Sequence, residues 1–374
     1  MREMNLATPI KRLAPLLALS ICPCLWGVEV STNPVGFYKV ECPANSDTHI
    51  SIPVTRPPVF EGKVASVSGS SLIFEGESAL GTEELAYEQG VQPNHYYAIF
   101  KDGPYEGAWF DVVSNTASSV VLECAESVLT SELAGSSVQI IPHWTLNTLM
   151  PNGAGTHTAK NAIPTSLVLF YSPDLVGVKF APTAFFFSDF GADSPYSYWC
   201  KTGDIDDEGN YFNQNDFVIP PNSVIAIRNP QNRDATALSF SGNVKMFASD
   251  VSVGILASST NQNNILASLS AVPIKLSDLT DSLIGDGLME KNTIPVDLLL
   301  VYDKSKVVKN KPLSSYYYYY AGEGNAFNGW YKLNGDAKMD DLEILSTDAV
   351  YIRKAAKLKD PYVNSSTFTP NYLQ

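Results

Sequence analysis

The feature that most limits the fold of this chain is a pattern that occurs twice, at a constant separation of 131 positions. The apolar run Leu167–Tyr171 recurs as Leu298–Tyr302. Further landmarks keep the same offset, namely Phe185–Phe187 with Tyr316–Tyr318, Trp199 with Trp330, and Lys201 with Lys332. One separation kept by several landmarks indicates tandem duplication. Two related domains are therefore expected, which argues against a single catalytic centre.

The order of matching segments extends upstream, but the spacing between them differs. Residues 45–52 resemble 261–269, and the strand that ends at Pro142 resembles the one that contains Pro273. The path between these landmarks takes about ninety residues in the first copy and about ten in the second. An insertion explains the difference, because lengthening a loop costs little free energy. Short apolar runs and tight turns over residues 59–137 are typical of a small closed barrel.

The whole chain has the pattern of β-structure. Short runs rich in Val, Ile, Tyr, Phe and Thr alternate with clusters of Gly, Pro, Asn, Asp and Ser. The sequence predicts an all-β protein with two related β-sandwich-like domains (an internal duplication), the first interrupted by a small inserted β-barrel. The expected boundaries are 1–27 for a signal peptide, 28–58 plus 138–240 for the first repeat domain, 59–137 for the barrel, 241–356 for the second repeat domain and 357–374 for a C-terminal tail.

The N-terminus has the pattern of a secretory signal. Arg2, Lys11 and Arg12 precede an apolar stretch, residues 13–26, that is too short and too interrupted by proline to span a bilayer. Cleavage is expected after Gly27. The predicted location is therefore secreted, periplasmic or cell-surface, and no transmembrane segment is expected in the rest of the chain.

The charge of the chain limits its partners. Its formal net charge is −14, and removing residues 1–27 leaves 22 Lys+Arg and 38 Asp+Glu, a net charge of −16. An acidic surface repels phosphate backbones, so nucleic acid is not expected to bind. Because 45% of the residues are hydrophobic, the chain can form packed cores, and disorder is not expected.

Three cysteines follow the predicted signal segment. In an oxidising compartment Cys42 and Cys124 are candidates for a disulfide, with two free thiols as the alternative. Cys200 occupies the position of Tyr331 in the other copy. It is therefore expected to be a small buried side chain and not a nucleophile.

One acidic loop is a candidate metal site. Residues 204–210 place Asp204, Asp206 and Glu208 at alternating positions before Gly209 and Asn210. This spacing matches the beginning of a calcium-binding loop of the EF-hand type, whose oxygens turn towards one centre. The last position of that loop would be Asn215 instead of Glu, and no helix pair flanks it. A structural calcium ion is one interpretation, and a solvated acidic loop is the other; no other cofactor is expected.

A run of five tyrosines, Tyr316–Tyr320, is the candidate ligand surface. On a strand, Tyr317 and Tyr319 face one side and the other tyrosines face the opposite side. Exposed rings, together with Trp199 and Trp330, could stack on sugars or on a partner protein. Cross-strand packing of the aromatic rings inside a sheet is the alternative, and the phenylalanines of the first copy favour it.

Motifs for catalysis are absent from the sequence. No nucleophile motif, zinc motif or phosphate-binding loop occurs, and the four histidines are scattered. No residue is therefore assigned a catalytic role.

Several short landmarks resemble an uncharacterised family of exported bacterial β-rich proteins. They are Asn33–Gly36, Asn45–Thr48, Trp144–Leu146 and the repeated apolar strand with Tyr171 and Tyr302. The resemblance covers most of the chain after residue 27. It implies export and a β-rich fold, and it implies no activity, because that family has none assigned.

These observations favour a secreted, non-enzymatic structural or adhesive protein that self-associates. A carbohydrate-binding protein that takes a surface glycan on exposed aromatic rings is the alternative. A polysaccharide-active enzyme is the third hypothesis.

Overall fold

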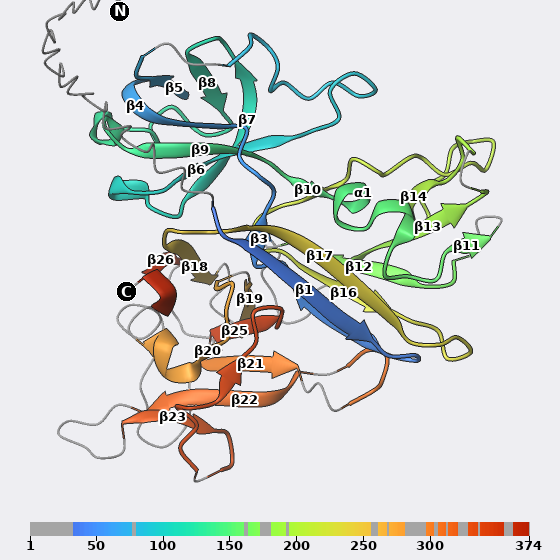
Figure 1. The fold of residues 1–374 in the computed structure, drawn as a ribbon. Coiled ribbons are helices and arrows are strands. Elements are labelled where there is room, and N and C mark those ends of the chain that lie inside the picture. Colours follow the sequence, from blue (N-terminus) through green and yellow to red (C-terminus); the bar gives the residue numbers. More distant parts are fainter. Residues whose placement is uncertain are drawn as a thin grey trace, which may run out of the picture. The chain divides into compact units, whose positions relative to one another are not determined.

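The computed structural model of the chain describes residues 33–76, 80–160, 164–172, 181–191, 194–255, 261–267, 269–280, 297–302, 306–311, 313–320, 328–335, 337–354 and 362–373. Almost every described element is a β-strand (Figure 1), which confirms the predicted all-β class. The predicted signal peptide, residues 1–27, lies outside the described residues. No helix within the described ranges is long and apolar enough to cross a membrane.

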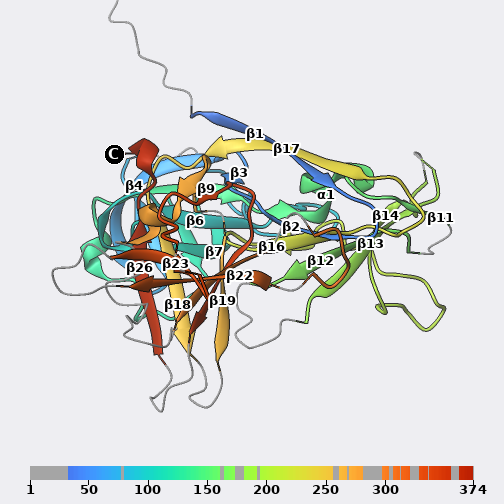
Figure 2. The same ribbon diagram turned by 90° about the horizontal axis from the view of Figure 1, so that it is seen from below.

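The first repeat contains two sheets. A three-stranded sheet has the order β1-β17-β3, and Figures 1 and 2 show β1 and β17 side by side along their length. A second sheet has the order β11-β13-β12-β16-β2, with β14 beside β13. The strands are β1 (Val35–Cys42), β2 (Asp47–Ser51), β3 (Val54–Thr55), β11 (Ala159–Lys160), β12 (Leu167–Tyr171), β13 (Thr183–Asp189), β14 (Tyr198–Lys201), β16 (Val224–Arg228) and β17 (Thr236–Val244).

The core of the first repeat takes side chains from both sheets. Ile50, Val168 and Phe185 of the larger sheet form one buried cluster with Leu238 and Phe240 of β17. A short strand pair, β10 (Trp144–Thr145) with β15 (Val218–Ile219), leads into the helical turns α1 (Leu146–Leu149) and η3 (Pro151–Gly153). The first turn of α1 is closed by reciprocal hydrogen bonds between Thr145 and Thr148.

The second repeat is built from equivalent parts. Its main sheet has the order β19-β25-β21-β22-β23, and two further strand pairs are β18 with β26 and β20 with β24. The helical turn η4 (Leu276–Leu279) follows β20 as α1 follows β10. The strands are β18 (Ser249–Ile255), β19 (Gln262–Leu266), β20 (Ile274–Lys275), β21 (Leu298–Tyr302), β22 (Leu313–Tyr320), β23 (Gly329–Lys332), β24 (Glu343–Ile344), β25 (Val350–Lys354) and β26 (Tyr362–Phe368), and η5 (Asn371–Leu373) ends the described chain.

The two main sheets share one strand order. The path β2-β16-β12-β13-β14 in the first repeat corresponds to β19-β25-β21-β22-β23 in the second. The central pairings also correspond, because Leu167 faces Arg228 and Leu298 faces Arg353. A shared order and register is what duplication would leave, and the duplication itself stays a prediction.

The strand pairing matches the two aromatic runs at an offset that is one residue larger than the 131 positions of the sequence pattern. Leu299 faces Tyr317 in the second repeat as Val168 faces Phe185 in the first. The phenylalanine run of β13 therefore matches Tyr317–Tyr319. A register shift at the end of β21 accommodates the extra residue.

The repeats contact each other through equivalent faces of their main sheets. Leu169 and Tyr171 of the first repeat share a buried cluster with Leu300 and Tyr351 of the second, and Tyr302 packs against it. Hydrogen bonds also join the repeats, for example from the hydroxyl of Ser51 to the carbonyl of Ser346 at 2.9 Å. Burial of apolar side chains from both sheets holds the repeats together.

The inserted segment forms a closed barrel with the strand order β4-β5-β8-β7-β6-β9. Closure pairs every strand on both sides and leaves no open edge. Buried Val64, Phe100 and Leu133 belong to its core. The elements are β4 (Phe60–Ser68), β5 (Ser71–Phe74), β6 (Tyr96–Phe100), η1 (Gly103–Tyr105), β7 (Trp109–Asn115), β8 (Ser119–Leu122), η2 (Ser131–Leu133) and β9 (Ser137–Pro142).

Three expected boundaries differ from the strand pairing. The barrel extends to Pro142, beyond the predicted end at 137, because β9 pairs with β4 and β6. Residues 241–244 belong to the first repeat, because β17 pairs with β1 as far as Asn243 and with β3 through Val244. The predicted C-terminal tail contains β26, which pairs with β18. Sequence matching missed these pairings because the partners lie far apart in the chain.

The barrel begins and ends at one place on the first repeat. The Trp144 indole donates a hydrogen bond to the carbonyl of Val54 at 3.0 Å. The Arg56 guanidinium donates another to the carbonyl of His143 at 3.2 Å. These bonds tie the segment that leads into the barrel to the segment that leaves it.

Candidate functional site

The aromatic residues predicted to bind a ligand lie in the two cores. Trp199 and Trp330 are 0% exposed, and Tyr317 is 5% exposed. Each indole donates a hydrogen bond to the residue that follows a helical turn. Trp199 donates to the carbonyl of Met150 at 3.2 Å, and Trp330 donates to the hydroxyl of Thr280 at 3.1 Å. The ligand role predicted for these residues is therefore wrong, because the rings fill the cores and a sugar cannot reach them.

Tyr317, Tyr318 and Tyr319 alternate between the two faces of their strand. Tyr319 is partly buried, packs against the core with Tyr317, and meets Trp330 edge-on with ring centroids 5.7 Å apart. On the opposite face Tyr318 stacks on Tyr331 at 5.9 Å. These three rings thus pack across strands within a sheet, which was the alternative interpretation.

The acidic loop is closed by its own hydrogen bonds. One carboxylate oxygen of Asp206 accepts bonds from the backbone N–H groups of Glu208 and Asn210, at 3.0 and 2.8 Å. These bonds lower the pKa of Asp206. The carboxylate takes the place of a backbone carbonyl as the hydrogen-bond acceptor of the turn. The carboxylate of Asp204 accepts a bond from Gln214 instead. In the parts of the chain described, no group of three acidic, His or Cys side chains is placed to hold a metal. The calcium ion stays a prediction.

Among the described residues, Cys42, Cys124 and Cys200 carry free thiols. Cys42 is buried in the core of the first repeat, whereas Cys124 packs against the core of the barrel. Of the two alternatives, free thiols are therefore correct and the disulfide is wrong, since the two side chains belong to different cores. Cys200 is 1% exposed and packs with Ala159 and Phe186, as expected for a small buried side chain.

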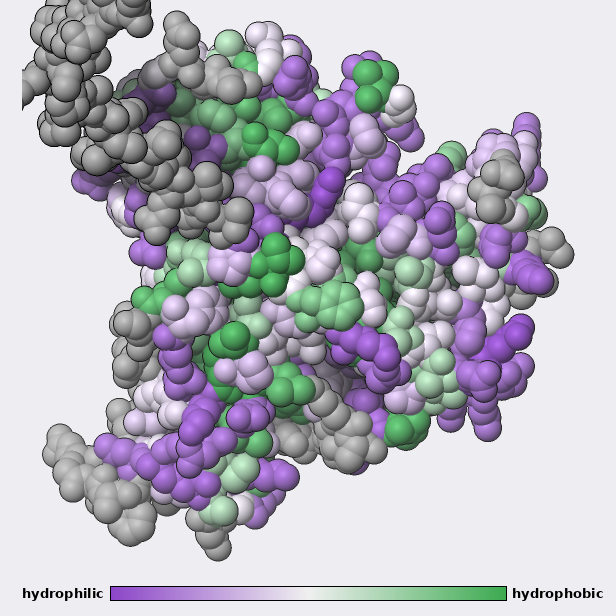
Figure 3. All heavy atoms as spheres, viewed as in Figure 1, coloured by the Kyte–Doolittle hydropathy of each residue, from purple (hydrophilic) through white to green (hydrophobic). Residues whose placement is uncertain are grey.

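The first strand presents an apolar edge. β1 is the end strand of its sheet, and its side chains alternate between outward and inward positions. Val35 and Phe37 point outward and are 68% and 71% exposed. Figure 3 shows hydrophobic surface over the region where Figure 1 draws the beginning of β1. Exposed apolar side chains on an edge strand are a template for pairing with another strand.

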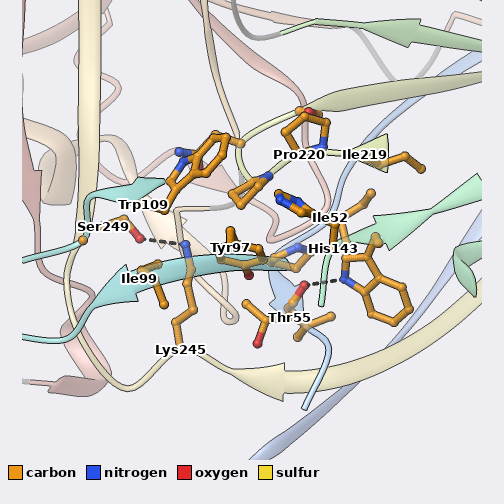
Figure 4. A pocket seen from close by; sticks show the side chains of 17 residues that line it. Ile52, Thr55, Tyr97, Ile99, Trp109, His143, Ile219, Pro220, Lys245 and Ser249 are labelled. Carbon is orange, nitrogen blue, oxygen red and sulfur yellow. Dashed lines mark hydrogen bonds between the residues drawn. The ribbon is translucent and has the colours of Figure 1, made fainter. Parts of the chain in front are cut away.

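A small pocket lies where the barrel meets the first repeat (Figure 4). Its volume is about 30 Å³, room for about two waters. His143 lies in its wall with 1% exposure, and its Nε2 is 2.6 Å from a carboxylate oxygen of Asp111. Its Nδ1, the Asn222 side-chain oxygen and the Ser223 hydroxyl are buried without a hydrogen-bond partner in the described residues. Ordered water is the partner that such groups usually take.

Lys245 is the cation of this pocket. Figure 4 shows its side chain reaching past Ile99 to Ser249, where the ammonium donates a hydrogen bond to the hydroxyl at 2.8 Å. Burial lowers the pKa of Lys245 to about 8. An amine of this kind can act as a base towards a hydroxyl. The backbone of Gly107 packs directly on residues 248–250, however, and the pocket is too small for a substrate.

A larger cavity of about 260 Å³ lies between the two repeats. We call it the inter-repeat cavity; it is lined by Lys39, Val40, Glu41, Pro43, Thr48, His49, Val301, Tyr302, Lys306, Lys311, Leu345, Thr347, Asp348 and Ala349. The ring of His49 stacks on Tyr302 with centroids 3.6 Å apart. Burial lowers the pKa of His49 to about 3, so the ring is neutral.

Little in the sequence pattern indicates that these residues lie in cavities or on an exposed edge. His49 and Lys245 stand alone without a motif, and only the pairing of distant segments brings each into a cavity. Val35 and Phe37 alternate with other residues as in any strand, so their exposure depends on which strand lies at the edge. The one available signal was the difference between the copies, since His49 corresponds to Ile265.

Comparisons with known protein families, curated proteins and solved structures found no match to this chain.

Proposed function

We propose that the protein is a secreted, non-enzymatic structural or adhesive β-protein whose copies associate through β1. The observation that carries the proposal is the exposed edge strand, with Val35 and Phe37 pointing outward. Strands with this character add readily to a further strand, because unpaired backbone groups gain hydrogen bonds and apolar side chains leave water. The signal-like N-terminus and the acidic composition support a location outside the cytoplasm.

A second copy of the chain is the partner that β1 fits. In an antiparallel pair of β1 strands related by a two-fold axis at Gly36, Val35 of each copy lies opposite Phe37 of the other. Pairs of an aromatic and a β-branched side chain stabilise neighbouring strands by about 0.2–1 kcal/mol. The strand is therefore complementary to itself, as an interface between identical subunits must be.

The oligomeric state tests this proposal. Sedimentation velocity of the full chain should show a concentration-dependent dimer. The Phe37→Lys variant should shift it to monomer, because a charge then lies at the centre of the interface. Phe212→Lys is the matched control, since Phe212 is 50% exposed outside β1. Added salt should strengthen the dimer by screening the negative charge. A monomer at all concentrations, or an equal effect of both substitutions, refutes the proposal.

Carbohydrate binding remains a second candidate, at a different place. Phe190 and Tyr196 are 49% and 64% exposed, and their rings meet with centroids 6.3 Å apart. Such a pair can stack on a sugar ring. A glycan array should show signal for the wild type and none for Phe190→Ala/Tyr196→Ala, while Tyr87→Ala should bind as the wild type does. An array without signal for the wild type excludes this candidate.

A further inference from the structure

The inter-repeat cavity is large enough for a small molecule. Its volume of about 260 Å³ exceeds the roughly 150 Å³ in which an engineered protein cavity holds benzene. Residues of β1 and β2 line one side, and residues of β21, of segment 306–311 and of segment 345–349 line the other. Both repeats therefore contribute to one binding space.

The floor of the cavity carries a neutral imidazole. His49 touches the open space, and its ring is stacked on Tyr302 and lies 5.6 Å from Tyr171. Because both aromatic neighbours belong to the inter-repeat packing, the ring is held in a fixed orientation. Its Nδ1 has no hydrogen-bond partner among the described residues. A neutral imidazole offers one donor and one acceptor to a ligand.

The scaffold does not require a histidine at this position. The equivalent residue of the second repeat is Ile265, because His49 faces Ala226 as Ile265 faces Tyr351 in the matching sheet. An apolar side chain completes the same strand there. The polar ring of His49 is thus a difference between the copies and not part of their shared framework.

Among the described residues, the walls carry more cations than carboxylates. Lys39, Lys306 and Lys311 line the cavity with Glu41 and Asp348, in a chain whose net charge is −14. Lys39 and Glu41 pair with each other at 2.6 Å. A locally positive wall on an acidic protein attracts an anion. The hydroxyl-bearing Thr48 and Thr347 add further groups that can bind polar atoms.

We propose that the inter-repeat cavity binds a small hydroxylated carboxylate of the size of a monosaccharide acid. Its carboxylate would lie towards the lysines, and its hydroxyl groups towards His49 and the threonines. The site shares β1 with the proposed interface but includes neither Val35 nor Phe37. Dimer formation and ligand binding are measured separately, so either proposal can fail without the other.

Calorimetric titration of the full chain with glucuronate tests the proposal, with uncharged glucose as the matched probe. Saturable binding of glucuronate and none of glucose is the expected result. A disaccharide of uronic acids separates two sources of the ligand, since binding of glucuronate alone indicates a free acid and binding of both indicates the end of a polysaccharide.

Two variants locate the site. His49→Ile, which copies the second repeat, and Lys311→Glu should each weaken glucuronate binding at least tenfold. Lys309→Glu makes the same charge change on a residue that does not line the cavity and should bind as the wild type does. Lys311→Glu alone decides the question if His49→Ile does not fold.

Binding should stay constant between pH 5 and 8, because His49 is neutral throughout. No heat with glucuronate, equal binding of glucose, or equal loss in Lys309→Glu overturns the proposal.

Discussion

Ser166 and Asn229 in the first repeat occupy the positions of Asp297 and Lys354 in the second. The neutral pair is joined by a hydrogen bond of 2.8 Å from the serine hydroxyl, and the charged pair by one of 2.7 Å from the lysine ammonium. All four side chains are buried. The contact is thus retained while its chemistry differs. The sequence could not reveal this correspondence, because Ser166 differs in type from Asp297, and Asn229 differs in type from Lys354.

The charged pair can be exchanged for the neutral one. Lys354→Asn alone removes the ammonium from a buried carboxylate and should lower the free energy of unfolding by about 3–5 kcal/mol. The double variant Asp297→Ser/Lys354→Asn copies the first repeat and should recover most of that loss. Urea denaturation of wild type, both single variants and the double variant measures the coupling. Losses that simply add would contradict the equivalence of the two pairs.

A second residue-scale prediction concerns Lys245. Its pKa is about 8 in the fold, below the usual value near 10.5. Between these values the unfolded chain binds more protons, so the free energy of unfolding should rise as the pH rises from 8 towards 10. Lys245→Met should remove this rise and add about 1–3 kcal/mol of stability at pH 7.

Denaturant titrations at pH 7, 8, 9 and 10 measure the effect for wild type and variant. The range stops at pH 10 because buried tyrosines reverse the trend above it: burial raises the pKa of Tyr302 to about 12, so their ionisation destabilises the fold. Parallel stability curves for the two proteins between pH 8 and 10 would rule out an ionisation of Lys245 in that range.

At the scale of elements, apolar runs and turn residues were enough to locate most strands and the all-β class. They could not set the register of the tyrosine strand. A shift by one residue exchanges the two faces of a strand, and a run of five identical residues contains no pattern that fixes it. The pairing of Tyr317 with Leu299, and with it the burial of Tyr317, depends on the register shift at the end of β21.

The two buried tryptophans should have equal structural roles. Trp199→Phe and Trp330→Phe each remove the indole N–H that bonds the residue after a helical turn, and each leaves a small cavity. Each should lower the free energy of unfolding by about 1–3 kcal/mol. Thermal unfolding measures the loss, and Phe212→Leu on the surface is the control. Full stability with lost glycan binding would instead indicate a ligand role for these rings.

At the scale of the whole molecule, the insertion of a barrel into the first repeat was visible in the unequal spacing of matched segments. The limits of the insertion were not, because β9 resembles a repeat strand in sequence but closes the barrel. The sequence also could not predict where either of the two cavities lies. Each cavity is lined by segments that only tertiary packing brings together.

Because its ends lie together, the barrel should be removable. A Gly-Ser linker in place of residues 57–142, combined with Phe247→Ser, should leave a folded protein. The substitution is needed because Phe247 packs on Tyr97 and Ile99 of the barrel. Cooperative thermal unfolding with β-type circular dichroism is expected. The full chain with Phe247→Ser is the control, and loss of cooperative unfolding in the shortened protein alone would show that the repeat depends on the barrel.

The bonds that tie the two ends of the barrel together also determine how the chain carries mechanical load. Tension applied between β3 and β10, the strands on either side of the barrel in the chain, passes from Val54 to Trp144 across their hydrogen bond. The barrel lies in a closed loop beside this route and carries no tension while the contact holds. Once it breaks, the barrel can release extra length on the order of 300 Å. A copy anchored at both ends would therefore stay stiff under moderate tension and would lengthen only after the contact breaks.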